Sequence, residues 1–92
     1  LQQNYPNPFN PQTRISYTLP ERAAVRLVVY DLTGSEIMVL VDGWRSAGSH
    51  HVIWDGRDAV GREMPSGAYL YQLRTNAGTS KQAVTRRMLF LR

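Results

Sequence analysis

The alternation that decides the fold is clearest in AYLYQLRT, residues 68–75. Tyr69, Tyr71 and Leu73 occupy one set of alternate positions, and the other set mixes apolar with polar side chains. Because successive side chains of a strand point to opposite faces, this period of two predicts a strand with one apolar face directed at a core.

The same period recurs along the rest of the chain. Further strands are expected at residues 14–19, 25–30, 36–41, 49–54 and 81–91, with Arg62–Met64 as a short seventh at an edge. Turn residues separate these segments at Asp31–Gly34, Asp42–Gly43 and Asn76–Gly78. No stretch carries a useful helical apolar stripe. The pattern predicts an all-β fold, an immunoglobulin-like antiparallel β-sandwich of about seven strands.

The apolar side of each expected strand defines the expected core. Its members are Ile15, Leu19, Val25, Leu27, Val29, Ile37, Val39, Val52, Trp54, Tyr69, Tyr71, Leu73, Val84 and Met88. Burying a dozen such side chains, at roughly 1.5–3 kcal/mol each, offsets much of the ordering entropy of a domain this size. In the last strand, Val84, Met88 and Phe90 are expected to face inward, which leaves Arg87 outside and Arg86 near an edge.

The first twelve residues differ from the rest, because prolines stand at positions 6, 8 and 11. Proline fixes φ and pushes its predecessor towards extended geometry, so a stiff, extended segment is expected. Tyr5 and Phe9 are expected to pin it to the sandwich. Residues 1–12 are therefore expected to be a lead-in packed on the domain, and residues 13–92 the sandwich itself.

Composition excludes several classes of protein. The chain has 92 residues, 42% of them apolar and 20% charged, which is typical of one globular domain. It has no cysteine, so disulfides, thiolate zinc sites and cysteine nucleophiles are excluded. No apolar run approaches the length of a membrane-spanning helix. The opening residues include neither Met nor a basic region, and we expect the chain to be the C-terminal part of a longer protein.

Charge is distributed unevenly along the chain. The formal net charge is +4, and no carboxylate side chain follows Glu63. The bases after that point are Arg74, Lys81, Arg86, Arg87 and Arg92. This basic block is either a solvated strand face or an electrostatic handle for an acidic receptor or anionic glycolipid.

Residues suited to catalysis or metal binding are few. His50 and His51 are adjacent on an expected strand and must point to opposite faces, so they cannot act as a pair. Asp55 and Asp58 are the one candidate pair for a metal ion such as calcium. Their loop does not fit an EF-hand, and Arg57 places a cation between them. We expect both carboxylates to set turns, and we expect no catalytic residue, metal or cofactor.

Two kinds of binding remain to be weighed. The sequence pI of about 10.0 suggests nucleic acid, but there is no zinc-finger spacing or recognition helix, and Tyr69 and Tyr71 are expected in the core. No nucleic-acid partner is therefore expected. Trp44 follows Asp42–Gly43 in an expected loop, where an exposed indole could stack on a sugar ring. An accessory module that binds carbohydrate or another protein is the alternative function.

The order of short motifs resembles a known family. These are NYPNPFNP at residues 4–11 with TRISY at 13–17, VYDLTG at 29–34, WDG at 54–56, PSGAYLY at 65–71 and TRRMLFLR at 85–92. They resemble the type A C-terminal sorting domain of the type IX (Por) secretion system of Bacteroidetes, over essentially the whole chain. The central motifs are also similar to the immunoglobulin-like domain of the flagellar hook-capping protein.

The resemblance implies a non-catalytic sorting signal carried by a larger exported protein. Such a protein passes through the periplasm, crosses the outer membrane and becomes attached to the cell surface or secreted. The implied partners are the outer-membrane secretion machinery and sortase, the upstream cargo domain and an anionic lipopolysaccharide. The implied recognition residues are Arg86, Arg87, Met88, Leu89, Phe90, Leu91 and Arg92. The lead-in motif of the family falls on Asn4, Tyr5, Pro6, Asn7, Pro8 and Phe9.

Overall fold

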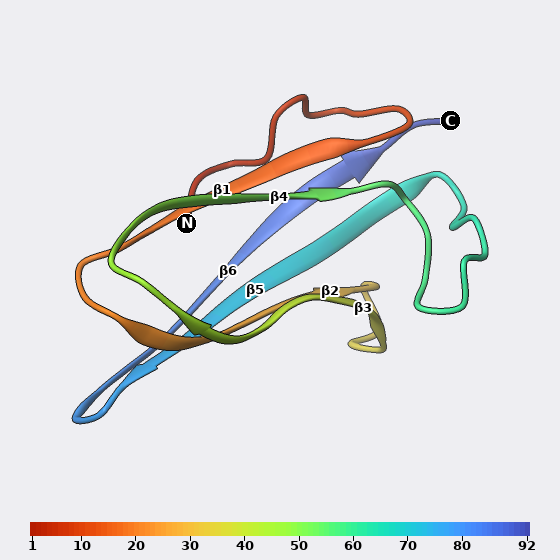
Figure 1. Cartoon of the computed structure of the whole chain (residues 1–92). Helices are drawn as coiled ribbons and strands as arrows, with labels where there is room; N and C mark the ends of the chain where they lie inside the picture. Colours follow the sequence, from red (N-terminus) through yellow and green to blue (C-terminus); the bar gives the residue numbers. More distant parts are fainter.

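Six strands and no helix make up the regular structure of residues 1–92, all of which the computed structural model describes (Figure 1). The strands are β1 (Thr13–Leu19), β2 (Ala23–Tyr30), β3 (Glu36–Arg45), β4 (Gly48–Trp54), β5 (Gly67–Ala77) and β6 (Ser80–Phe90). The expected seventh strand at Arg62–Met64 is wrong. Glu63 makes only an isolated bridge to Arg57, because the chain turns back on itself within this loop. With no helix present, none is long and apolar enough to cross a membrane.

The strands form two antiparallel sheets that enclose the core. Four strands lie in the order β3-β2-β5-β6, and the second sheet contains only β1 and β4. In Figure 1, β1 and β4 lie together against one part of the larger sheet, and the turn between β5 and β6 lies well away from them. The predicted immunoglobulin-like sandwich is confirmed, with six strands rather than seven.

The core lies between the sheets, and most of the expected residues are in it. The buried cluster consists of Phe9, Ile15, Tyr17, Leu19, Val25, Leu27, Val29, Val41, Trp54, Tyr69, Tyr71, Leu73, Met88 and Phe90. Ile37 and Val52 pack against it while half-buried, and Val39 is also half-buried. Val84 is wrong as a core residue, since it is 40% exposed. It points to the core side of the sheet, but β1 and β4 do not extend over it.

Two strands, β3 and β5, continue beyond the C-terminal ends that the sequence pattern indicates. β3 continues through Asp42 and Gly43 to Arg45, because Gly43 adopts a φ of +148° and stays in register opposite Val25. Trp44 therefore lies on a strand and not in a loop. β5 extends to Ala77, so the hairpin turn is tighter than expected and uses Gly78 at a φ of +74°.

The lead-in joins the two sheets along one side of the sandwich. Tyr5 forms an antiparallel bridge with Arg14 on the edge of β1, and Phe9 forms a parallel bridge with Phe90 on the edge of β6. Bends separate the two bridges, so the segment is not extended throughout. Phe9 is only 2% exposed, as expected of an anchor. Tyr5 is wrong as a side-chain anchor, because its ring is 80% exposed and only its backbone holds the segment.

Candidate interaction surface

Asn4 fixes the start of the lead-in from inside the protein. It is 2% exposed, and its backbone N–H donates to the Tyr71 hydroxyl at 2.8 Å. Its side-chain amide donates to Thr13 Oγ1 at 3.0 Å. The Tyr71 hydroxyl donates in turn to the Gln2 carbonyl at 2.8 Å, and burial raises the pKa of that hydroxyl above its ordinary value of 10.0. Asn4 thus satisfies buried polar groups and has no side-chain atom free for a partner.

Asn7 and Phe9 cover the outer edge of β6 near its end. Asn7 Oδ1 accepts from the Leu89 N–H at 2.9 Å. The Phe9 N–H donates to the Leu89 carbonyl and the Leu91 N–H donates to the Phe9 carbonyl, both at 3.1 Å. The Phe9 ring stacks on Phe90 with centroids 4.8 Å apart. The lead-in therefore completes the sheet here, as an added strand would.

Trp54 and Gly56 of the Trp54-Asp55-Gly56 motif pack against the Phe90 ring. The Trp54 indole N–H donates to the Arg57 carbonyl at 2.9 Å, which satisfies the one polar atom of a side chain that is 1% exposed. Gly56 has a φ of +77°, and a Cβ at this position would lie 2.7 Å from Phe90 Cζ. Only glycine fits, because both the backbone angle and the ring exclude a side chain.

The two candidate metal ligands hold turns. Asp55 Oδ1 accepts from the Arg57 N–H at 3.2 Å. Asp58 Oδ1 accepts from the N–H groups of Val60 and Arg62, and its other oxygen takes the Arg62 guanidinium at 2.9 Å. These hydrogen bonds, with the Arg62 backbone first, lower the pKa of Asp58 below its ordinary value of 3.8. No group of three or more His, Asp or Glu side chains comes together in the chain.

The two histidines occupy different surroundings. The His50 ring stacks on Tyr17 at 5.3 Å, and its Nε2 lies 2.8 Å from the Ser46 carbonyl. His51 is exposed on the opposite face of β4. The structure does not bring them together.

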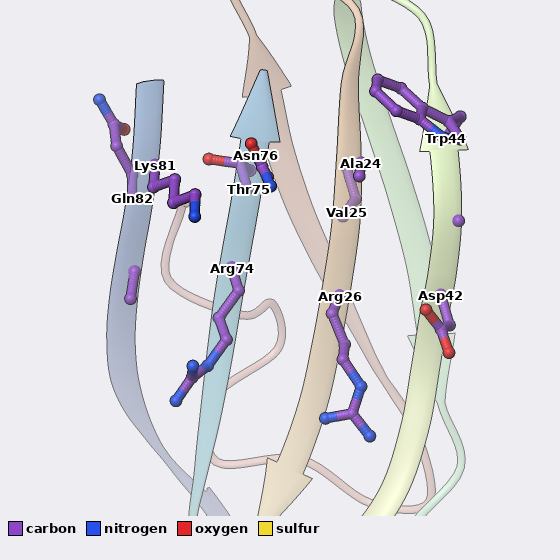
Figure 2. A pocket seen from close by; sticks show the side chains of 12 residues that line it. Ala24, Val25, Arg26, Asp42, Trp44, Arg74, Thr75, Asn76, Lys81 and Gln82 are labelled. Atoms are coloured by element: carbon purple, nitrogen blue, oxygen red, sulfur yellow. The ribbon is translucent and has the colours of Figure 1, made fainter. Parts of the chain in front are cut away.

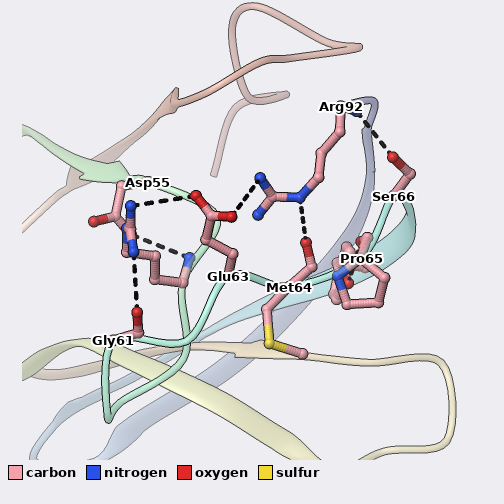
Figure 3. A network of polar contacts seen from close by, with 9 residues as sticks. Asp55, Gly61, Glu63, Met64, Pro65, Ser66 and Arg92 are labelled. Atoms are coloured by element: carbon pink, nitrogen blue, oxygen red, sulfur yellow. Dashed lines mark hydrogen bonds and ion pairs between the residues drawn. The ribbon is translucent and has the colours of Figure 1, made fainter.

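Arg92 is engaged by the domain itself (Figure 3). Its Nε donates to the Met64 carbonyl at 2.7 Å, and its Nη1 lies 3.3 Å from a Glu63 oxygen. Glu63 also forms an ion pair with Arg57, with 3.4 Å between Oε1 and Nη2, so its carboxylate bridges two guanidinium groups. The Arg92 backbone N–H donates to Ser66 Oγ at 2.9 Å. These contacts tie the end of the chain to the loop before β5.

The rest of the expected recognition set divides between core and surface. Met88 and Phe90 are each 1% exposed, whereas Leu89 and Leu91 are 38% and 47% exposed. Arg86 donates from Nε to the Leu1 carbonyl at 2.8 Å, so it lies at the edge held by the lead-in. The remaining member, Arg87, is exposed and makes no ion pair.

A groove of about 640 Å³ crosses the outer face of the four-stranded sheet (Figure 2). Cross-strand pairing places the lining residues in two rows that run from β3 through β2 and β5 to β6. One row is Trp44, Ala24, Asn76 and Lys81, and the other is Asp42, Arg26, Arg74 and Ala83. Figure 2 shows Arg26 and Arg74 lying side by side, with Trp44 and Lys81 on opposite sides of the groove. Arg26 pairs with Glu36 at 3.0 Å, and Arg74 bonds only the neutral Gln72.

Trp44 is 53% exposed at this groove, and Arg22 lies 4.4 Å from its ring centroid. Sequence reasoning identified the exposed indole and missed the groove. The lining residues are far apart along the chain, and only the pairing register would have brought them together.

Comparison with known proteins places these features in a family. The sequence profile of the FlgD Ig-like domain matches residues 7–79. No curated protein sequence matches this chain. The structure of FlgD from P. aeruginosa is 28% identical with a TM-score of 0.69, over 85% of this chain and 60% of that protein.

Two further solved structures share the fold over nearly the whole chain. Dimeric latent PorU from Porphyromonas gingivalis is 18% identical with a TM-score of 0.79, over 97% of this chain and 9% of PorU. PorZ from the same organism, described as an essential bacterial surface component of the type-IX secretion system, is 22% identical with a TM-score of 0.60. That match spans 98% of this chain and 11% of PorZ. The chain thus spans under two thirds of FlgD and about a tenth of the other two.

Proposed function

This chain belongs to the FlgD Ig-like domain family, and we propose that it serves as the non-catalytic C-terminal sorting domain of a type IX secretion cargo. The observation that carries the proposal is the extent of the shared fold. The family profile ends at residue 79, whereas the PorU domain covers 97% of the chain, which requires most of β6 as well. The lead-in that covers the β6 edge is the same segment whose sequence resembles the sorting family.

The proposed partners and route follow from that role. An upstream cargo domain would pass through the periplasm with this domain folded, and the outer-membrane machinery would recognise the folded surface. A sortase would then act on the cargo and join it to an anionic lipopolysaccharide. A folded signal must be read from its edges, loops or charged patches, because its apolar side chains are buried. No catalytic role is proposed for the domain, in which Asp55 and Asp58 hold turns and the histidines lie apart.

The test is delivery of a periplasmic reporter to the cell surface. A signal peptide and reporter are fused ahead of residues 1–92 and expressed in a host with the type IX system, and surface reporter is measured on intact cells. The matched control replaces this chain with the P. aeruginosa FlgD Ig-like domain, which has the same fold. We expect delivery with this chain and not with the control. Absence of delivery with both domains would contradict the proposal.

Point substitutions test recognition better than truncation does. Deleting residues 88–92 removes Met88 and Phe90 from the core, so the loss of delivery would report unfolding. Arg87→Glu reverses the one exposed arginine of the expected recognition set whose side chain makes neither an ion pair nor a hydrogen bond. We expect it to reduce delivery while the melting temperature stays unchanged.

Carbohydrate binding is the second candidate, favoured by the groove beside Trp44. Its lining offers an exposed indole, the Asn76 amide and the cations of Arg74 and Lys81. Binding of the purified domain to insoluble polysaccharide, lost in Trp44→Ala, would support this module function. Equal binding by the wild type and the variant would count against it.

A further inference from the structure

The outer edge of β6 is free over its first half. The N–H groups of Leu89 and Leu91 point outward to the lead-in, so alternation directs the N–H and C=O groups of Lys81, Ala83 and Thr85 outward as well. None of these backbone groups makes a hydrogen bond on that side. All residues from Ser80 to Arg87 are exposed. Here Ser80–Arg86 is called the free half of β6, and Arg87–Phe90 the covered half.

The free half lacks two of the usual protections of an edge strand, a bulge and a proline. β6 pairs with β5 from Ala77↔Ser80 to Gly67↔Phe90 without a register shift, and it contains no proline. The opposite edge strand of the sheet, β3, has two register shifts. Unbroken edges with unpaired backbone groups are templates for another strand, and bulges or prolines normally prevent this. On the outer face of β6, Lys81 is the only charged residue before Arg87, and its side chain extends towards β5 at the groove (Figure 2).

Charge decides which strand could be added. In the antiparallel register that pairs Ala83 of one molecule with Thr85 of another, a second copy would place Lys81 opposite Arg87, and like charges directly opposite are destabilising. Arg74 lies on the adjacent strand, next to Ala83, and no carboxylate side chain occurs after Glu63. An acidic segment meets complementary charge instead. On the inner face, Val84 is 40% exposed and offers an apolar contact to the incoming strand.

We propose that the free half of β6 is a strand-addition site for an extended acidic segment of a partner protein. Backbone hydrogen bonds to Lys81, Ala83 and Thr85 would supply affinity, and alternate acidic side chains would supply the charge match. That this partner belongs to the secretion machinery rests on the proposed function. The binding itself is a property of the isolated surface.

The first test uses the unmodified domain and a short peptide that alternates glutamate with valine. Amide hydrogen exchange is followed by NMR with and without the peptide at low salt. We expect the amides of Lys81, Ala83 and Thr85 to exchange fast in the free domain and to become protected in the complex. The matched peptide with lysine in place of glutamate should give no protection.

Two variants test the same site from the side of the domain. Ala83→Pro removes an outward N–H and is tolerated at an edge, so we expect peptide affinity to fall by more than about tenfold with little change in melting temperature. Lys81→Glu keeps the backbone and should weaken binding by about fivefold. Should Ala83→Pro fail to fold, Lys81→Glu and the exchange data still decide the matter.

Three results would overturn the proposal. The acidic peptide could leave all three amides unprotected, or it could perturb only the groove around Trp44. The domain could also dimerise through these amides, which would make a second copy the occupant.

Reporter delivery separates this inference from the proposed function. Delivery that is unaffected by Ala83→Pro would contradict the strand-addition site as the recognised surface. Peptide binding without any delivery of the wild-type fusion would contradict the sorting role and leave the site standing.

Discussion

The two halves of β6 have the same partner strand and opposite surroundings. Met88 in the covered half is 1% exposed, whereas Val84 in the free half is 40% exposed, although both point to the same side of the sheet. The covered half lies beneath the second sheet, and its edge is bonded to Phe9. The free half has no second sheet over Val84 and no strand along its outer edge, where its one hydrogen bond with the lead-in is the one from Arg86 to the Leu1 carbonyl. Alternation thus determines the direction of a side chain, and burial depends on what lies opposite.

The comparison also shows that the surface available to a partner lies upstream of the expected recognition residues. Most of the expected recognition residues at the end of the chain belong to the core or are held by the lead-in and the loop before β5. The unsatisfied backbone groups lie upstream, at Lys81, Ala83 and Thr85. Substitutions of the buried residues Met88 and Phe90 in the covered half should therefore alter stability, and those in the free half should alter binding.

The largest difference is expected between Phe9→Ala and Val84→Ala. Phe9 stacks on Phe90 at 4.8 Å and lies 5.6 Å from Trp54, so its loss should lower the free energy of unfolding by about 3–5 kcal/mol. Val84→Ala should cost less than about 1 kcal/mol. Urea denaturation measures both. Similar losses of unfolding free energy for the two variants would mean that the free half is packed after all. If Phe9→Ala does not fold, Phe9→Leu can be measured in its place.

A second pair of variants separates steric fit from backbone conformation. Gly56 and Gly78 have φ of +77° and +74°, but only a Cβ at Gly56 would meet Phe90, at 2.7 Å. Alanine at either position should lower the free energy of unfolding by about 1–2 kcal/mol, because the backbone there is left-handed. Gly56→Ala should lose about 1–3 kcal/mol more through overpacking under the covered half. Equal unfolding free energies would show that the Phe90 ring moves aside freely.

Asn7→Ala should lower the free energy of unfolding by about 1 kcal/mol, because it removes the side-chain oxygen that accepts a hydrogen bond from the Leu89 N–H at 2.9 Å. The Leu89 amide should then exchange faster with solvent, towards the rates of the free half. Asn10→Ala is the control, because Asn10 is exposed and makes no side-chain hydrogen bond. An unchanged Leu89 exchange rate would indicate that the backbone bridges of Phe9 protect this edge without Asn7.

The smallest effect is expected from acid. The pKa of Asp58 lies below its ordinary value of 3.8, so its stabilising contribution is present above that pH and is lost as the pH falls through the folded-state value. The melting temperature of Asp58→Asn should lie below that of the wild type near neutral pH, and the gap should narrow below pH 3.8. A constant gap would contradict this. The free half should contribute nothing to the acid response, since residues 64–92 carry no carboxylate side chain.

Sequence alone determined the fold class and most strand positions of this protein. The period of two identified every strand of the sandwich, because pleating imposes it wherever one face is buried. It overestimated the strand count at Arg62–Met64, where local turn bonds prevail. It also ended β3 too early, since the backbone freedom of Gly43 is ambiguous between a turn and a strand.

Tertiary structure alone decided which surfaces remain open. The sequence indicated that Val84, Met88 and Phe90 share a side and that the lead-in is special. It could not indicate that a two-stranded sheet stops short of Val84, or that Asn7 and Phe9 cover only the end of β6. Burial and edge pairing arise from contacts between segments that are distant in the chain, and the alternation of one strand carries no information about how far its neighbours extend.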